Sequence, residues 1–253
     1  MATVWFCIGV AALIFAFGIL GLYLQTLLPE PHSAEKSRDM IGAVVGLVSL
    51  LLALVLGTLV GSTYAFYANQ KAEIETLAAR ALQLDIALSE YGPETGFARG
   101  KMKDTLSSIR AMIWGGSAET APDMSVGEPI EHLRLMDMYV ASLEPKTPMQ
   151  RQFAATAGAD AGAIEQTRLL ISLQLASPVS WPLVAIVVSW AAILFCGFGV
   201  LSRFNATTVV AVALGAFAVG SALFLIFELS QPFTGVFRIP SGAFDQMLAS
   251  LGK

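Results

Sequence analysis

The stretch IGAVVGLVSLLLALVLGTLVGSTYAFY, residues 41–67, decides the fold class of this chain. It contains no Asp, Glu, Lys, Arg or His. Because an α-helix rises about 1.5 Å per residue, a run of this length is longer than the roughly 30 Å of hydrocarbon that a spanning helix must cross. The stretch therefore predicts a membrane-spanning helix.

This helix is expected to have two different faces. At 100° per residue, small side chains fall within about 120° of one another, which lets another backbone approach closely. The small residues of this helix-packing face are Gly42, Gly46, Ser49, Ala53, Gly57 and Gly61. The opposite face begins apolar and becomes hydroxylated, and its residues are the candidate lining of a pore: Val44, Leu51, Val55, Thr58 and Ser62. Ordinary helix packing also explains the glycines, so both interpretations stay open.

The composition indicates an integral membrane protein. The chain has 253 residues, of which 55% are hydrophobic and 13% charged, and its mean hydropathy is +0.67. These values lie far from those of a soluble domain. The net charge of -4 gives no general attraction to nucleic acid.

Four apolar segments are long enough to span the bilayer: 4–28, 41–67, 182–201 and 206–227. We therefore predict an all-α fold with four transmembrane helices and both termini on one side. Asn205 is placed to cap the last span. The fourth span also carries a small-residue stripe that includes Gly215, for which we expect a packing role.

The predicted domain order follows from these spans. Residues 1–67 form the first transmembrane pair, 68–180 a cytoplasmic helical insert, 181–229 the second pair and 230–253 a cytoplasmic tail. Basic residues set the orientation, because they are enriched on the cytoplasmic side. The bias favours cytoplasmic termini in a bacterial inner membrane, with Lys71, Arg80, Arg168, Arg238 and Lys253 inside against Lys36, Arg38 and Arg203 outside.

The insert is expected to be helical. An amphipathic pattern continues from the second span until Gly92 and Pro93 stop it; its apolar positions are Ile74, Leu77, Ala81, Leu84, Leu88 and Tyr91. Further helices are predicted over 95–114, 128–143 and 148–176, with a loop at 115–127.

Three segments carry a resemblance to a known family. They are QLDIALSEYGPETGFARGKM (83–102), the Ile113–Trp114 pair, and ELSQPFTGVFRIPSGAF (228–244). Together they resemble the bestrophin-like membrane proteins grouped as DUF4239, over essentially the whole chain. One departure is that Ser230 and Gln231 precede the PF element, where the family pattern leads us to expect an acidic residue. The candidate tail motif is therefore Glu228, Pro232, Phe233 and Gly235.

That family is distantly similar to bestrophins, which are pentameric anion channels with a pore lined by the second span. The resemblance implies a homo-oligomer, of five subunits as in the bestrophins, that passes small anions such as chloride. The alternative is a different class of function: a non-conducting structural or accessory membrane protein that binds a partner complex, with its small-residue stripes serving packing alone. Four basic residues of the insert, Arg99, Lys101, Lys103 and Arg110, could also surround a vestibule that attracts anions.

The spans lack the groups that other membrane functions need. No charged residue or His occurs in the middle of any span, which disfavours an ion-coupled pump and an intramembrane acid–base enzyme. Cys7 and Cys196 lie inside apolar runs. The sequence predicts no enzyme, no metal site and no cofactor.

The predicted topology is testable at Ser37. In the variant Ser37→Cys, a membrane-impermeant maleimide added outside intact cells should label the protein, because residues 29–39 are expected on the outer side. The parent chain, whose two cysteines lie in apolar runs, is the control. Labelling only from the cytoplasm would contradict this topology.

Overall fold

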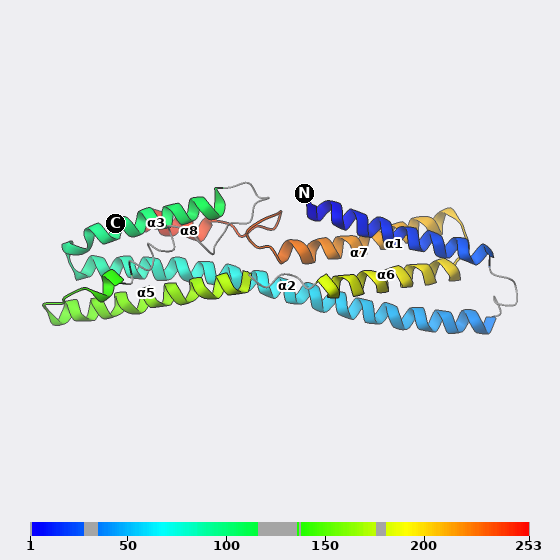
Figure 1. Cartoon of the computed structure of the whole chain (residues 1–253), viewed down its shortest axis with the longest axis horizontal. Coiled ribbons are helices and arrows are strands. Elements are labelled where there is room, and N and C mark those ends of the chain that lie inside the picture. Colours follow the sequence, from blue (N-terminus) through cyan, green and yellow to red (C-terminus); the bar gives the residue numbers. More distant parts are fainter. Residues whose placement is uncertain (1, 28–34, 116–135, 137, 176–180, 253) are drawn as a thin grey trace. The chain divides into compact units, whose positions relative to one another are not determined.

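The computed structural model describes residues 2–27, 35–115, 136, 138–175 and 181–252, and within these ranges the regular structure is entirely helical. The chain divides into two compact units. Unit 1 comprises Met1–Phe66 and Val179–Ser230, and unit 2 comprises Tyr67–Pro178 and Gln231–Lys253. Helix α2 (Glu35–Tyr91) contributes residues to both (Figure 1).

Unit 1 contains the four apolar helices that the sequence predicts. They are α1 (Ala2–Leu27), the first part of α2, α6 (Trp181–Leu201) and α7 (Ala206–Leu229). In the described part of the chain these four helices are long and apolar enough to cross a membrane. The Asn205 cap is confirmed, because its side-chain oxygen accepts a hydrogen bond from the Thr208 backbone N–H at 2.7 Å.

Glycines bring α1, α6 and α7 into close contact. A Cβ added at Gly21 of α1 would overlap the Cys196 carbonyl of α6, and one added at Gly199 would overlap the Gly18 carbonyl. A Cβ at Gly220 of α7 would lie 2.9 Å from the Ala11 Cβ. These helix backbones therefore pass one another without intervening side chains, as small-residue contacts in membranes allow.

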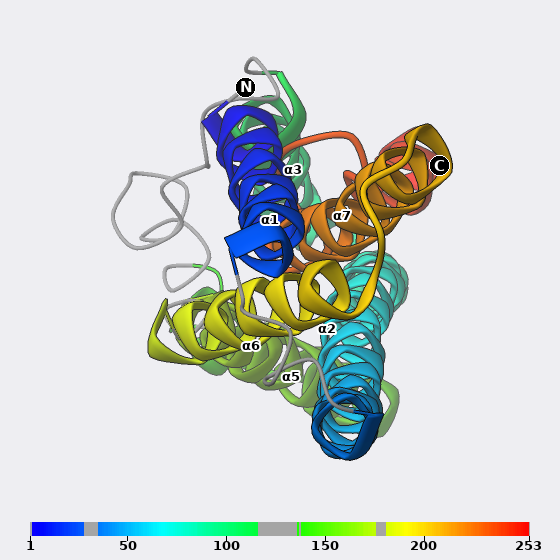
Figure 2. The same ribbon diagram turned by 90° about the vertical axis from the view of Figure 1, so that its right-hand side faces the viewer.

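Helix α2 is attached to this bundle along one side. Its Val45 and Leu52 are buried, and Leu52 belongs to the unit 1 core. A Cβ added at Gly197 of α6 would lie 2.6 Å from Val45 Cγ2. The end-on view shows α6 between α1 and α2 (Figure 2). Only 11% of the most apolar window of α2 is buried, against 28–39% for the other three helices.

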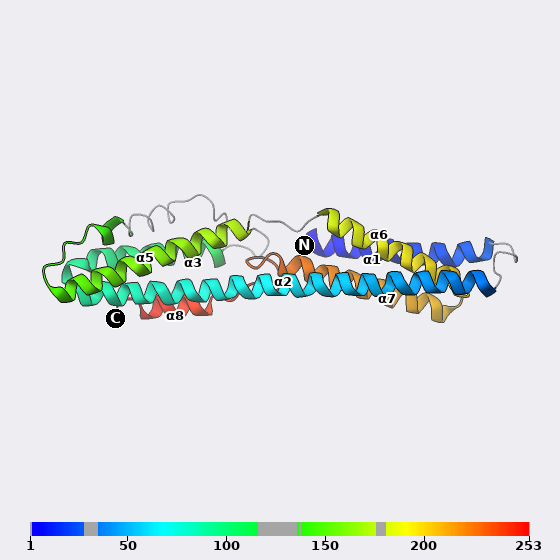
Figure 3. The same ribbon diagram turned by 90° about the horizontal axis from the view of Figure 1, so that it is seen from below.

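Unit 2 is a second helical bundle. Its parts are the remainder of α2, the short η2 (Pro93–Thr95), α3 (Gly96–Trp114), α5 (Pro148–Leu175) and α8 (Gly242–Ser250). Helices α5 and α8 run alongside α2 (Figure 3). The predicted amphipathic pattern is confirmed, since its six apolar positions are all buried: Ile74, Leu77, Ala81, Leu84, Leu88 and Tyr91.

The turn after α2 has the sequence Gly-Pro-Glu-Thr. Gly92 has φ of 148°, a conformation that favours glycine. Thr95 is fully buried, and its hydroxyl lies 2.6 Å from the Leu88 carbonyl and 2.8 Å from the Gly92 carbonyl. This turn reverses the chain so that α3 packs back along α2.

The structure tests only some of the remaining sequence predictions for unit 2. The helices predicted over 95–114 and 148–176 are confirmed by α3 and α5. The loop predicted at 115–127 and most of the helix predicted at 128–143 lie outside the described residues. Residues 231–253 are not a separate tail in the structure, because they belong to unit 2 and contribute α8.

The glycine contact between α1 and α6 predicts a specific sensitivity. Gly21→Ala should lower the stability of the detergent-solubilised protein by about 2 kcal/mol, because the added methyl meets rigid backbone. Gly9→Ala is the matched control on the same helix, since no atom lies within 4 Å of its added Cβ. Thermal unfolding measures both variants. Equal midpoints for the two would contradict the close contact.

Candidate functional site

The predicted pore-facing residues do not share one environment within the subunit. Val44 and Leu51 are 51% and 43% exposed, and Thr58 and Ser62 are also exposed. Val55 is half-buried and packs against the unit 1 core. The face that the sequence assigned to a pore therefore borders the side of α2 attached to its own bundle. Its pore-lining role stays a prediction.

The predicted helix-packing residues also fall into two groups. A Cβ added at Gly42, Gly46, Gly57 or Gly61 meets no atom within 4 Å, and Ala53 is exposed. In contrast, a Cβ added at Gly215 of α7 would lie 2.8 Å from Phe195 Cζ of α6. No other helix of the described chain therefore packs closely on these α2 glycines, and a close-packing role for them requires another molecule.

Sequence reasoning did not single out the most exposed strip of α2. Leu47, Leu50 and Leu54 are 59%, 72% and 64% exposed and lie opposite the buried Val45 and Leu52. The sequence predicts two faces on α2, whereas the structure has four sectors: the attached side, two flanks, and the strip of leucines between the flanks. Their spacing of three and four residues was the available signal.

The exposed hydroxyls of α2 are bound to their own helix. Thr58 Oγ1 donates to the Val55 carbonyl at 2.9 Å, and Ser62 Oγ donates to the Leu59 carbonyl at 3.0 Å. With the hydroxyl proton used in this way, the oxygen lone pairs remain available. In this geometry the hydroxyls present acceptors, not donors, to their surroundings.

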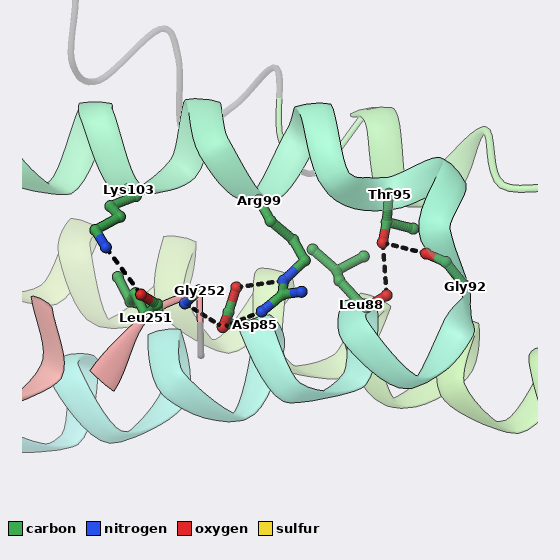
Figure 4. Close-up of polar contacts among 8 residues, drawn as sticks. All are labelled: Asp85, Leu88, Gly92, Thr95, Arg99, Lys103, Leu251 and Gly252. Carbon is green, nitrogen blue, oxygen red and sulfur yellow. Dashed lines mark hydrogen bonds and ion pairs between the residues drawn. The ribbon is translucent and has the colours of Figure 1, made fainter. Parts of the chain in front are cut away.

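In unit 2, a polar network joins α2, α3 and the segment after α8 (Figure 4). The Arg99 guanidinium donates to both oxygens of Asp85, at 2.7 Å from Nε and 2.9 Å from Nη2. The Gly252 backbone N–H also donates to Asp85, at 3.1 Å, and Lys103 Nζ donates to the Leu251 carbonyl at 2.9 Å. Asp85 is only 3% exposed and the Arg99 side chain is 20% exposed, so the carboxylate of this bidentate pair is buried and the guanidinium partly so.

The network determines the charge state of Asp85. Burial disfavours its carboxylate, but hydrogen bonds from Arg99 and from the Gly252 N–H, and the charges of Arg99 and Lys103, lower its pKa overall. Arg110 forms a second pair, with its Nε 2.8 Å from Asp245 Oδ1. That hydrogen bond, together with one from Ser241, lowers the pKa of Asp245.

These contacts bear on the anion vestibule that the sequence suggested. The charges of Arg99 and Arg110 are balanced by carboxylates, and Lys103 is bound to a backbone carbonyl. Lys101 is exposed. Three of the four basic residues therefore stabilise the bundle in this structure, which weakens the case for an anion-attracting field there.

The tail-motif residues lie in different units. Glu228 is 7% exposed, within unit 1, whereas Pro232 and Phe233 are buried in unit 2. Gly235 has φ of 78°, which favours glycine in that turn. Among the residues that the structure describes, no group of three His, Cys, Asp or Glu side chains could hold a metal ion.

The Asp85 pair predicts a pH-dependent stability. A carboxyl whose folded pKa is lowered contributes stability above its unfolded pKa of about 3.9, and that contribution is lost as pH falls through the folded pKa. Asp85→Asn should cost about 3 kcal/mol at pH 7, because Arg99 loses its buried partner. It should also flatten the decline in unfolding temperature below about pH 4.

The control for this prediction is Glu75→Gln. Glu75 is half-exposed and lies 3.9 Å from Lys71, so its removal should change stability by under about 1 kcal/mol. Thermal unfolding at pH 7 and along an acid series measures both variants. An Asp85→Asn protein as stable as the control would contradict the assigned role.

Comparison with solved structures shows the fold. The crystal structure of a mutant bacterial bestrophin homolog from Klebsiella pneumoniae matches with a TM-score of 0.70 and 13% identity, covering 98% of this chain and 99% of that chain. The homolog from the same organism solved by Zn-SAD phasing matches with a TM-score of 0.66 and 12% identity, covering 96% of each chain. A further mutant crystal structure, described as a membrane protein, matches with a TM-score of 0.68 at 12% identity.

The sequence itself establishes the family. No curated protein matches the chain. A family model described as the Bestrophin-like domain matches residues 12–244, which is most of the chain. This match agrees with the fold and with the segments singled out in the sequence, and the chain therefore belongs to the Bestrophin-like domain family.

Proposed function

We propose that several copies of this chain form a membrane channel for small ions, with the pore lined by α2. One observation carries the proposal: the apolar window of α2 is only 11% buried, the lowest share of the four helices. Lipid alone could cover leucines, but this surface also carries exposed glycines and hydroxyls. Glycines suit close contact with another helix, and hydroxyls suit contact with water or ions.

The positions of these residues around α2 suggest which of them face the central axis of such an assembly. In a ring of copies, the side of α2 attached to its own bundle would face outward, and the opposite strip of Leu47, Leu50 and Leu54 would face the centre. The flank with Gly46 and Gly57 would pack on a neighbouring copy. A ring of leucines can gate by dewetting.

The ion that the family resemblance implies is a small anion such as chloride. The resemblance also implies five copies, with the unit 2 bundle and both termini on the cytoplasmic side of a bacterial inner membrane. A homo-oligomer is required in any case, because one helix cannot enclose a pore. These finer features are part of the proposal.

Cation conduction is a second candidate, and a specific observation favours it. Thr58 and Ser62 donate their hydroxyl protons to their own helix, so their oxygen lone pairs are available to a cation in the pore. No basic side chain occurs along this part of α2, and Arg99 and Arg110 are paired with carboxylates. Oxygen lone pairs without nearby positive charge interact favourably with cations.

Leu54→Ala tests the proposal in planar bilayers. Removing an axis-facing leucine should widen the apolar constriction and raise the single-channel conductance several-fold. Leu214→Ala is the matched control, because Leu214 of α7 is 65% exposed and Leu54 is 64% exposed. The control should conduct like the wild type.

The reversal potential under a KCl gradient then identifies the permeant ion. A value near the chloride equilibrium potential supports anion conduction, and one near the potassium potential supports cation conduction. Purified protein that passes no ion, and that co-purifies stoichiometrically with a partner complex, would contradict the channel and support the accessory function.

A further inference from the structure

Residues 232–239, which directly follow the last membrane helix, form a closed turn. The Ile239 N–H donates to the Pro232 carbonyl at 2.8 Å, so the two ends of the turn are bound together. The Thr234 N–H donates to the carbonyl of Gln231, just before the turn, at 3.1 Å, and Gly235 adopts a positive φ of 78°. The turn therefore has a defined tip at Val236 and Phe237.

The base of this turn is fixed in the unit 2 core. Phe233 and Ile239 are 4% and 1% exposed. Trp114 Nε1 donates to the Ile239 carbonyl at 2.9 Å, and Arg238 donates to the carbonyl of Ile113. The tip is therefore held on a rigid platform built from α3 and the turn itself.

The tip exposes apolar side chains on this platform. Val236 is 75% exposed and Phe237 is 44% exposed, although buried Phe233 and Ile239 flank them in sequence. Transfer of a valine and a phenylalanine from water to an apolar medium is favourable, so such a medium will cover them if it lies within their reach. A protruding tip of two apolar side chains can insert into a fluid apolar layer.

The position of the turn along the chain identifies that medium. Pro232 comes three residues after Leu229, the last residue of α7, so at about 3.5 Å per residue the turn begins within roughly 10 Å of the end of a membrane-spanning helix. The polar headgroup layer has a similar thickness on each side of the hydrocarbon. The tip is thus tethered within reach of the bilayer surface.

We propose that Val236 and Phe237 insert into the boundary between headgroups and acyl chains, on the side of the membrane where α7 ends. The partner is the lipid bilayer. This contact would anchor unit 2 to the membrane surface through α3 and the core residues of the turn. It does not depend on ion conduction and is tested without it.

Collision-accessibility measurements on the full chain in liposomes test this contact. Nitroxide labels are placed at Val236→Cys and Phe237→Cys, in a chain with Cys7→Ala and Cys196→Ala. Oxygen partitions into lipid, whereas a water-soluble nickel chelate does not. The ratio of the collision rate with oxygen to that with the nickel chelate should therefore be at least several-fold higher for both labels than for a label in water. Phe97→Cys is the control, because Phe97 of α3 is 78% exposed in the same unit and should give the water-like ratio.

Two results would overturn the proposal. One is an oxygen-to-nickel collision ratio at the tip equal to that at Phe97. The other is protection of the tip from both reagents, which would place it against protein. A second measurement keeps the native cysteines. Each of the variants Phe237→Trp and Phe97→Trp adds one fluorescent side chain. Lipids that carry bromine near the headgroup should quench the added fluorescence of Phe237→Trp and leave that of Phe97→Trp unchanged. Equal quenching of the two would also overturn the proposal.

Discussion

The structure depends on a constraint in unit 1: helix α2 is covered by its own bundle along one side only. Glycines at Gly21, Gly199 and Gly220 draw α1, α6 and α7 so close together that little room remains for a fourth helix among them. Helix α2 therefore packs at the edge through Val45 and Leu52, and most of its apolar surface faces away. Because most of its apolar surface is uncovered within the subunit, α2 is suited to contact other copies of the chain.

In the unit 2 bundle, basic side chains form ion pairs that stabilise the fold. Arg99 and Arg110 are each bound to a carboxylate, and the Asp85 pair is further bound to the backbone after α8. These pairs connect α2 and α3 to the C-terminal segment. Because the basic groups are engaged in stabilising the fold, selectivity for an ion would have to arise mainly on α2, where helix-bound hydroxyls lie beyond the leucines.

Much of this architecture could be predicted from the sequence, because it depends on periodicity and length. The four apolar helices, the buried series from Ile74 to Tyr91 and the Asn205 cap are local features with clear patterns. The partners of Asp85 were not predictable, since Arg99 and Gly252 are distant in sequence and meet only in the fold. The four sectors of α2 were not predictable for a related reason: the contact with Val45 depends on Gly197 in another helix.

We propose that the uncovered surface of α2 faces other copies of the chain around an axis. The most direct measurement is the native mass of the complex, released from a mild detergent in a mass spectrometer. The account predicts one closed species of at least three copies, and the family resemblance predicts five. A monomer or dimer as the only species would contradict the account, because one or two copies of α2 cannot enclose an axis.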